Sequence, residues 1–339
     1  AANLSSLTGT ADSIKGGAGT DTLSMTAVGA ASLAGDTVAD RAAITEFEAL
    51  RIDTINTDTD AGTTTKDFDI SKFGLNTLQL NSAITDDQAA TAQTLTVSGF
   101  TSGATVEFRA AATVTAATQV ALNVGMTGAT NAATPDDLLN VKLNADLVNQ
   151  TTANDALDVK LGVSGINKLV ITTADRDNTD GATKGDDGYK LTLTNDNNVS
   201  MITVSGTSEF TFATSATSSV ALTTFTATDL SADLFLNLSL NGLSQGVTVN
   251  GGSGVNTITG TGFADIIVGG AKADFITGGN GADTLTGGAG ADTFSFAAGS
   301  SGGIPSATVF DTITDFEKGS DIIDGPGNLT IATAGNAKI

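Results

Sequence analysis

The hydrophobic positions of residues 25–250 recur at short, strand-like intervals. Alternating apolar and polar residues in LTVSGF from Leu95, KLTLT from Lys190 and EFTF from Glu209 predict half-buried strands. A looser repeat runs beneath them, in which an apolar residue is followed three and five positions later by two more. It occurs at Phe47, Leu50 and Ile52; Leu75, Leu78 and Leu80; Ile166, Leu169 and Ile171; Val199, Ile202 and Val204; and, more faintly, Leu222, Phe225 and Ala227.

This spacing predicts the coils of an irregular β-solenoid, because the first residue can sit in a corner turn while the other two point from one strand into the same core. The stretch from Leu191 to Phe212 fits best, as three strands separated by NDNN and SGTS turns. An antiparallel sandwich is the alternative that the pattern leaves open. Two stretches favour short helical turns instead: residues 32–44, and residues 135–147 with their proline-led, acid-rich start.

Residues 251–295 follow a stricter pattern of five consecutive nine-residue units, GGSGVNTIT, GTGFADIIV, GGAKADFIT, GGNGADTLT and GGAGADTFS. Each unit has glycine first, Asp or Asn sixth and a large apolar residue eighth. Glycines allow a sharp turn whose carbonyls face a common point, the acid adds a carboxylate there, and the apolar residue points into a narrow core. The sixth residues are Asn256, Asp265, Asp274, Asp283 and Asp292, and the eighth are Ile258, Ile267, Ile276, Leu285 and Phe294.

Each nonapeptide is predicted to be half of a coil, so that the turns of units n and n+2 stack on one edge. Their carbonyls and carboxylates can then enclose a hard cation. Calcium accepts about six to eight oxygen ligands in flexible geometry, whereas magnesium prefers an octahedral shell with retained waters. We therefore expect several Ca²⁺ ions. A glycine-rich linker is the alternative, and five units that keep both the acid and the apolar position in register argue against it.

The pattern GGxGxDxUx, in which U is a large apolar residue, resembles the repeats of the repeats-in-toxin (RTX) family of type I secreted proteins. Units four and five match every consensus position. The earlier units depart from it at Asn256, at Thr261 and Phe263, and at Lys272. Residues 7–24 repeat the pattern as LTGTADSIK and GGAGTDTLS. Two half-coils cannot bury their own faces, so we expect them to stack on neighbouring coils or on sequence further upstream.

The segment after the block, residues 296–324, resembles the one that closes the roll in many RTX proteins. Asp311, Asp315, Asp321 and Asp324 alternate there with Ile313, Phe316 and Ile323. A terminal calcium site and solvated turn acids are equally good interpretations of these residues. The expected calcium ligands of the whole chain are Asp12, Gly17, Gly19, Asp21, Gly252, Gly254, Asn256, Asp265, Gly270, Asp274, Gly279, Gly281, Asp283, Gly288, Gly290, Asp292, Asp311 and Asp315.

Composition narrows the function further. The chain has 37 acidic and 15 basic residues among 339, a formal charge of −22, which disfavours nucleic acids and attracts cations. Its lack of His and Cys excludes Ser-His-Asp triads, cysteine nucleophiles, HExxH zinc sites and disulfides, and we expect no enzymatic activity. The N-terminus AANLSS has neither a Met nor a signal peptide, which favours a fragment or a processed piece.

Acidic loops interrupt the predicted strands at residues 57–69 and 174–189. Asp175, Asp177 and Asp180 are close enough in sequence to hold calcium, but Gly181 comes one place late for an EF-hand loop and no Glu closes it. A solvated surface is the favoured interpretation of both loops.

The whole chain most resembles the assembly region of bacterial surface-layer (S-layer) proteins, with long Thr/Ala/Asn-rich β-domains, no enzyme motif and roll repeats. This resemblance implies an extracellular protein on the cell surface, exported by a type I secretion system. Its copies would form a two-dimensional lattice bridged by calcium, anchored to a partner such as lipopolysaccharide through a region outside this chain.

The predicted organisation is an all-β chain with a short repeat pair at 1–24, a β-rich assembly domain at 25–250, a parallel β-roll with its closing segment at 251–325, and a tail at 326–339. Two other functions stay open. One is a segment of an RTX adhesin, although near-identical repeats of about 100 residues, the length of a typical domain, do not occur. The other is the carrier portion of a type I secreted enzyme that lacks its catalytic domain.

Overall fold

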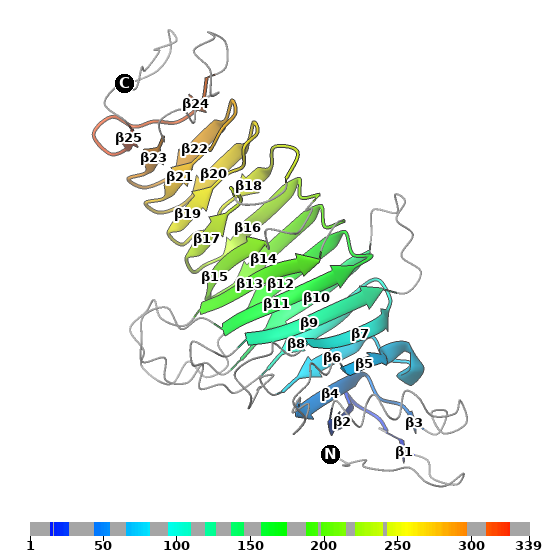
Figure 1. Cartoon of the computed structure of the whole chain (residues 1–339). Helices are drawn as coiled ribbons and strands as arrows, with labels where there is room; N and C mark the ends of the chain where they lie inside the picture. Colours follow the sequence, from blue (N-terminus) through cyan, green and yellow to red (C-terminus); the bar gives the residue numbers. More distant parts are fainter. Residues whose placement is uncertain are drawn as a thin grey trace. The chain divides into compact units, whose positions relative to one another are not determined.

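The computed structural model describes residues 14–15, 17–26, 44–54, 66–81, 94–109, 119–126, 137–145, 157–174, 188–195, 198–214, 221–239, 243–296 and 310–325. The chain divides into two compact units, Ala1–Tyr189 and Lys190–Ile339. Figure 1 shows the strands of each unit stacked as rungs, with successive strands alternating between two sheets. The predicted division at residues 24, 250 and 325 stays a prediction.

Two parallel sheets make up the first unit. One has the order β2 (Thr22–Thr26), β4 (Ala49–Thr54), β6 (Thr77–Leu80), β8 (Ala104–Phe108), β10 (Leu138–Leu143) and β12 (Lys168–Thr173). The other has the order β5 (Lys66–Asp69), β7 (Thr94–Phe100), β9 (Gln119–Met126) and β11 (Leu157–Ser164). A separate parallel pair joins β1 (Ile14–Lys15) to β3 (Ile44–Thr45). The boundary between the units falls within β13 (Gly188–Asn195).

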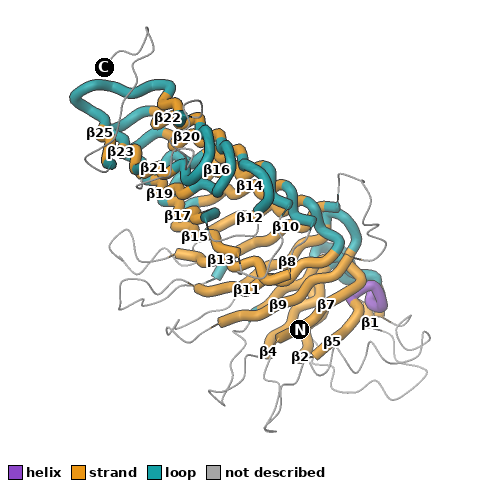
Figure 2. Tube along the Cα trace, turned by 45° about the horizontal axis from the view of Figure 1, so that its top comes forward, coloured by secondary structure: helices purple, strands orange, loops and turns teal. Residues whose placement is uncertain are grey.

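The second unit repeats this plan with shorter coils. One sheet has the order β14 (Met201–Gly206), β16 (Thr224–Leu230), β18 (Thr248–Asn250), β20 (Ile266–Gly270), β22 (Thr284–Gly288) and β24 (Thr312–Ile313). The other has the order β15 (Glu209–Thr214), β17 (Leu234–Asn237), β19 (Asn256–Thr259), β21 (Phe275–Thr277), β23 (Thr293–Ser295) and β25 (Ile322–Asp324). Figure 2 shows the turns that join the strands of the roll, residues 251–295, as loops between the two sheets.

The prediction of an all-β solenoid followed by a parallel β-roll is confirmed. Ile258 pairs with Ile276, and Ile267 with Leu285, so units n and n+2 are neighbours in one sheet and each nonapeptide is half a coil. The strand pairings of the described residues are parallel, which rules out the antiparallel sandwich.

One helical prediction was wrong. Residues 138–143 form the strand β10, in which Leu139, Val141 and Leu143 are buried and Asn140 and Lys142 face outwards. This period-two alternation has more weight than the proline and acids before it, because three buried side chains stabilise the strand by about 1.5–3 kcal/mol each. The other stretch, residues 32–44, lies outside the described residues except for Ile44, which begins β3.

The core is thin and continuous within each unit. The last two residues of every predicted apolar triplet are buried, for example Leu50, Ile52, Leu78 and Leu80. They also stack across coils, since Leu50 pairs with Leu78 and Ile52 with Leu80. The first residue of the triplets is buried beside the strand at Leu75, Ile166, Val199 and Leu222, and half-buried at Phe47.

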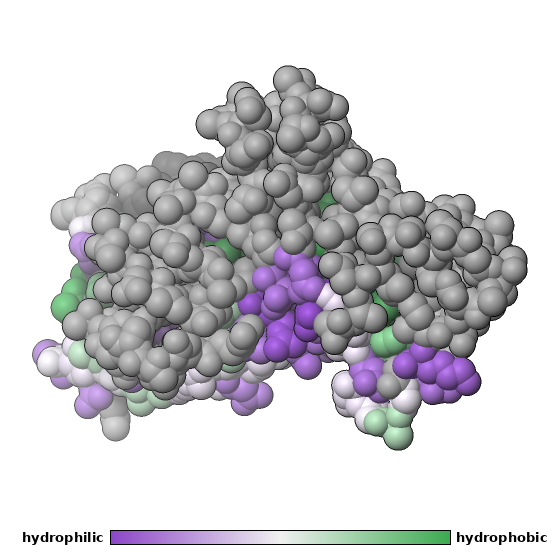
Figure 3. Space-filling model, turned by 90° about the horizontal axis from the view of Figure 1, so that it is seen from below, coloured by the Kyte–Doolittle hydropathy of each residue, from purple (hydrophilic) through white to green (hydrophobic). Residues whose placement is uncertain are grey.

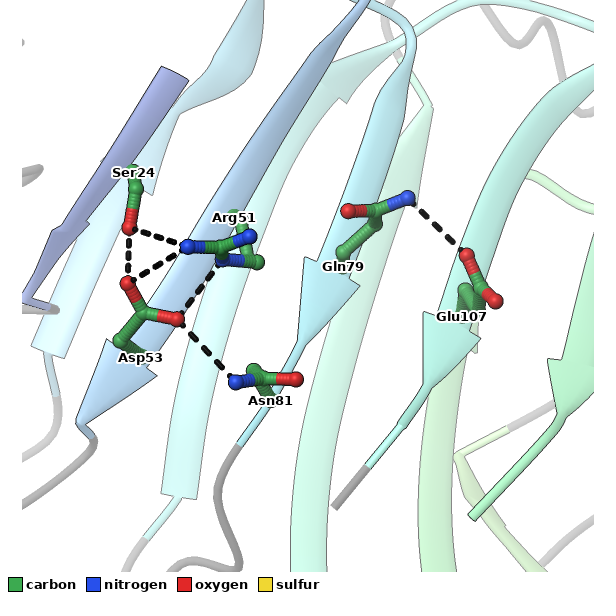
Figure 4. A network of polar contacts seen from close by, with 6 residues as sticks. All are labelled: Ser24, Arg51, Asp53, Gln79, Asn81 and Glu107. Carbon is green, nitrogen blue, oxygen red and sulfur yellow. Dashed lines mark hydrogen bonds and ion pairs between the residues drawn. The ribbon is translucent and has the colours of Figure 1, made fainter. Parts of the chain in front are cut away.

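Polar side chains cover the outward face of the β2–β4–β6–β8 sheet (Figure 4). Arg51 Nε donates a 2.7 Å hydrogen bond to Asp53 Oδ1, and Ser24 and Asn81 donate to the same carboxylate. Figure 3 shows that hydrophilic residues dominate the described surface on the face drawn there, with smaller apolar areas. The one helical element of the described residues is the 3₁₀ turn η1 (Ile70–Phe73). The described part of the chain thus contains no helix that is long and apolar enough to cross a membrane.

Candidate metal centre

The sixth residues of the nonapeptides form two columns in the second unit, one on each edge of the roll. Asn256, Asp274 and Asp292 belong to units one, three and five, and Asp265 and Asp283 to units two and four. Each of these side chains is at most 2 % exposed. Carboxylates are rarely buried without a partner, because removing a charge from water costs several kcal/mol or more. The columns therefore need a compensating group.

Hydrogen bonds link each column from coil to coil. The backbone N–H of Asp265 donates to Asp283 Oδ1 at 2.8 Å, and that of Asp274 donates to Asp292 Oδ1 at 2.9 Å. One carboxylate oxygen thus fixes the register with the preceding coil. The other oxygens of Asp274 and Asp283, their Oδ2 atoms, are buried and have no hydrogen-bond partner within the described part of the chain.

The first glycine of a unit makes room for the acid of the same unit. A Cβ at Gly278 would lie 2.1 Å from Asp283 Oδ2, and one at Gly287 would lie 2.1 Å from Asp292 Oδ2. Only glycine leaves this space open, so the carboxylate can fold back over its own turn.

The second and fourth residues shape the turn itself. Gly279 and Gly281 have φ angles of +109° and +136°, a left-handed conformation that side chains disfavour. Gly288 and Gly290 have nearly the same angles, +101° and +139°. In the stacked coils, a Cβ at Gly288 would lie 2.1 Å from the carbonyl oxygen of Gly270. Carbonyl oxygens therefore point into the space between successive turns, next to the acids.

Burial determines the electrostatics of the columns. Desolvation raises the pKa of Asp283 to about 7, against the lowering effect of the hydrogen bond from Asp265, and the charges of Asp311 and Asp265 raise it further. Desolvation also raises the pKa of Asp274 to about 6 and raises those of Asp265, Asp292 and Asp311. Without a cation, these acids therefore retain protons at a pH where surface carboxylates are ionised.

The donor set fits calcium. It consists of carboxylate and carbonyl oxygens, the ligands of hard cations, and the sequence offers no imidazole or thiolate. No group of three or more acidic side chains comes together among the described residues, so a site between two turns would take most of its ligands from backbone carbonyls. A bound calcium ion would supply the positive charge that the buried Oδ2 atoms of Asp274 and Asp283 lack.

The closing segment ends both columns. Asp283 N donates to Asp311 Oδ1 at 2.9 Å, and Asp292 N donates to Asp321 Oδ1 at 3.0 Å. Asp315 instead accepts from the backbone N–H groups of Gly287 and Gly288 at 2.9 and 2.8 Å, which places it over the last turn.

Asp321 was absent from the expected ligands, although a signal was available. Asp311-Thr312-Ile313 and Asp321-Ile322-Ile323 both repeat the D-x-U tripeptide of the nonapeptides. Asp324 does not follow this rule and lies exposed at the end of β25.

The N-terminal repeat has the same turn geometry. Gly17 and Gly19 have φ angles of +96° and +132°, like the glycines of units four and five. Asp21 N donates a 2.5 Å hydrogen bond to Glu48 Oε2, so Glu48 takes the place that the next acid has in the roll. The repeat pattern does not point to Glu48, because Glu48 follows Asp21 by 27 residues instead of the 18 that separate stacked acids in the roll. Asp12, and Asp175, Asp177 and Asp180 of the acidic loop, lie outside the described residues.

In the first nonapeptide of the roll, Gly252 and Gly254 lie against the preceding coil. A Cβ at Gly252 would lie 2.5 Å from the carbonyl oxygen of Leu230, and one at Gly254 would lie 2.1 Å from that of Ala232. A Cβ at Gly270 would similarly lie 2.0 Å from the carbonyl oxygen of Gly252. The structure thus brings the described candidate residues of the roll together between turns, and their roles as calcium ligands stay predictions.

Comparison with known proteins supports the metal chemistry. A family model of the RTX calcium-binding nonapeptide repeat matches the chain in four copies, over residues 8–24 and 259–294. Searches of curated proteins and of solved structures gave no match. The chain therefore carries RTX calcium-binding nonapeptide repeats near its N-terminus and in the roll.

Proposed function

We propose that this chain, with its RTX calcium-binding nonapeptide repeats, is a structural segment of a bacterial surface layer whose copies assemble outside the cell into a calcium-dependent two-dimensional lattice. One observation carries the proposal. Within each unit the described residues form stacked parallel coils around a thin apolar core, and the buried acids of the roll lie in columns that a cation can neutralise. Each unit thus supplies a regular stack of coils.

The net charge supports a role for calcium in assembly as well as in folding. A formal charge of −22 makes copies repel one another, and the repulsion is weakened when divalent cations neutralise acidic surfaces. Ions bound within the roll also stabilise the folded state in proportion to the logarithm of the calcium concentration. Both effects favour assembly where calcium is abundant.

Export by type I secretion fits the same physics. Inside a cell, where free calcium is low, no ion compensates the buried roll acids, and the entropy lost on ordering the glycine-rich turns leaves the folded roll least stable. Calcium outside the cell would then stabilise the folded roll. In this proposal the protein lies on the cell surface, anchored to a component such as lipopolysaccharide through a region outside this chain.

The proposal assigns no catalytic role. The charged side chains that are buried among the described residues are Asp265, Asp274, Asp283 and Asp292, and all four belong to the roll columns. Paired carboxylates elsewhere in the chain would be needed for a glycosidase, and the sequence marks no such pair.

The test compares the purified chain in millimolar calcium, in the same concentration of magnesium, and after chelation. Light scattering gives the particle size, and negative-stain electron microscopy gives its form. Ordered sheets in calcium alone are the expected result. A calcium-folded chain that stays monomeric at high concentration would contradict the lattice and favour an adhesin segment or a carrier portion. Folding that is indifferent to calcium would contradict all three.

A further inference from the structure

Asn256 has an unusual environment within the roll. It holds the sixth position of the first nonapeptide, where the other four nonapeptides have Asp, and it is completely buried. Its Nδ2 atom lies 3.0 Å from Gly254 O, 3.2 Å from Gly252 O, 3.2 Å from Gly269 O and 2.9 Å from Asp274 Oδ1. An amide nitrogen has two hydrogens, so four oxygens around it exceed what it can satisfy with full hydrogen bonds.

Convergence of oxygens on one point is the arrangement that a cation site needs. The four oxygens come from the turn of Asn256, from the start of the third unit, and from the acid of the next coil in the same column. They combine backbone carbonyls with one carboxylate, which is the donor set of the candidate calcium sites. The partly positive NH₂ group of Asn256 thus lies at the centre of a group of oxygens of the kind that binds a cation.

The backbone of the first nonapeptide turn differs from that of the later turns. Gly252 does not have a left-handed φ angle, and its N–H donates to Asn256 Oδ1 at 3.0 Å. The second turn is alike, because the N–H of Thr261 donates to Asp265 Oδ2 at 2.6 Å. In units three to five, by contrast, the second residue is a left-handed glycine: Gly270, Gly279 or Gly288.

Thr261 completes the second turn with its side chain. Its hydroxyl oxygen lies 3.0 Å from both Asp265 Oδ1 and Asp265 Oδ2, and it accepts from the N–H of Phe263 at 3.0 Å. The hydroxyl therefore lies where a cation would bind the carboxylate through both oxygens. Asp265 has donors for both oxygens, whereas Asp274 and Asp283 each keep a buried Oδ2 with no partner in the described part of the chain.

We propose that Asn256 and Thr261 are built-in substitutes for calcium, which end the two ion columns on the N-terminal side of the roll. Calcium binding then begins at the turns of Asp274 and Asp283. The first two turns are satisfied by hydrogen bonds alone, so they fold without the ion and present an ordered edge on which the calcium-dependent turns stack. The inference rests on the proposed calcium binding by the roll and specifies which turns take part.

The first variant is Asn256→Asp in the full chain. It places a third carboxylate near Asp274 and near Asp233, whose Oδ1 accepts from the neighbouring N–H of Val255 at 2.7 Å. Native mass spectrometry and calorimetric titration with calcium chloride should show one more ion per chain than the wild type. In chelator, the second unit should melt several degrees below the wild type, and calcium should reverse this loss.

Two further variants keep the test decisive if Asn256→Asp folds poorly. Asp274→Asn is the reciprocal change, and it should bind at least one ion fewer than the wild type. Asn256→Leu has a similar size but no donor, so it should melt at a lower temperature in chelator, and calcium should not restore it.

The outcomes separate this inference from the proposed function. An unchanged ion count in Asn256→Asp, together with a wild-type melting temperature of Asn256→Leu in chelator, would overturn the inference while leaving calcium binding intact. A wild-type chain that binds no calcium would refute the proposed function. A wild-type chain that binds calcium but forms no lattice would refute the proposed surface-layer function and leave this inference intact.

Discussion

The backbone N–H of Asp265 donates a 2.8 Å hydrogen bond to Oδ1 of Asp283, which follows it by 18 residues. Through this contact, the carboxylate of one coil fixes the strand register of the coil before it. It also leaves Oδ2 of Asp283 buried above its own turn, where it has no donor among the described residues. A single side chain thus joins the stacking of coils to the demand for a cation.

The substitution Asp283→Asn should separate these two roles. The carbonyl of the new amide side chain can still accept the hydrogen bond from Asp265, but the charge that attracts calcium is lost. We expect about a tenfold or greater loss of calcium affinity at that site, taking the roughly 1.5–3 kcal/mol of a hydrogen bond to a charged group as the scale of the lost contact. At a calcium concentration that just fills the wild type, the variant should therefore hold at least one ion fewer per chain. Calorimetric titration measures both quantities.

Asp229→Asn is the matched control, because Asp229 is an exposed acid on β16 of the same unit. It changes the net charge equally and should leave the ion count unchanged. Equal effects of the two substitutions would show that overall charge, and not the Asp283 position, governs calcium binding.

The pKa values predict an inverted pH dependence in chelator. Burial raises the pKa of Asp283 to about 7 and that of Asp274 to about 6, above the ordinary value of 3.8. The folded roll then binds more protons than the unfolded chain between about pH 4 and about pH 7. Its calcium-free stability should be greatest near pH 4 and should fall as the pH rises through 7, by an amount on the order of a few kcal/mol.

Thermal melting followed by circular dichroism, in chelator and in calcium, checks this dependence. Calcium should reverse it, because the ion binds the deprotonated acids and so stabilises the roll more as the pH rises. A calcium-free melting temperature that rises from pH 4 to pH 7 would contradict the raised pKa values.

Gly278→Ala should damage the site more than the fold. The added methyl group would lie 2.1 Å from Asp283 Oδ2 and would push the carboxylate off its turn. We expect a severalfold or larger loss of calcium affinity, with strand content in saturating calcium close to the wild type. Gly262→Ala is the control, since a Cβ there meets nothing within 4 Å. Titrations in which both variants match the wild type would contradict the role given to the first glycine.

Substitutions at two neighbouring residues of β21 test which side chains of the strand point into the core. Ile276 is completely buried, whereas Phe275 is 53 % exposed. Ile276→Asp buries an unpaired charge and should cost about 4–5 kcal/mol or more, enough to prevent calcium-induced folding of the roll. Phe275→Asp should fold with calcium as the wild type does. Cooperative calcium binding by Ile276→Asp, followed by circular dichroism, would refute the inward orientation.

The roll was predictable from sequence because its period is strict. A fixed nine-residue repeat determines which strands pair, which side chains are buried and which acids share a column, and the structure follows it from Asn256 to Phe294. Prediction became harder where the spacing changes. Stacked acids of the roll are 18 residues apart, but Asp321 lies 29 residues after Asp292 and Glu48 lies 27 after Asp21, so the coil spacing points to neither.

The first unit was predictable only in part. The apolar triplets correctly marked the strands that contain Leu50, Leu78 and Leu169, because their spacing reflects a strand next to a corner. The signals for a helix start at Pro135 misled because they are local, whereas β10 is stabilised by its pairing with β8 and β12. The repeat pattern shows that Asn256 and Thr261 depart from the consensus, but the oxygens around their side chains follow from atomic distances between turns, which the pattern does not give.

The coil-to-coil hydrogen bond between residues 18 apart also limits how such a roll can lengthen during evolution. Duplicating two nonapeptides adds one complete coil, and every later acid keeps its edge. Duplicating a single nonapeptide moves each later unit and the closing segment together to the opposite edge, and Asp311 and Asp321 still stack on the last two acids of the roll. Growth by whole coils therefore keeps every surface residue on its side of the roll, whereas gain of one nonapeptide exchanges the two edges beyond the insertion.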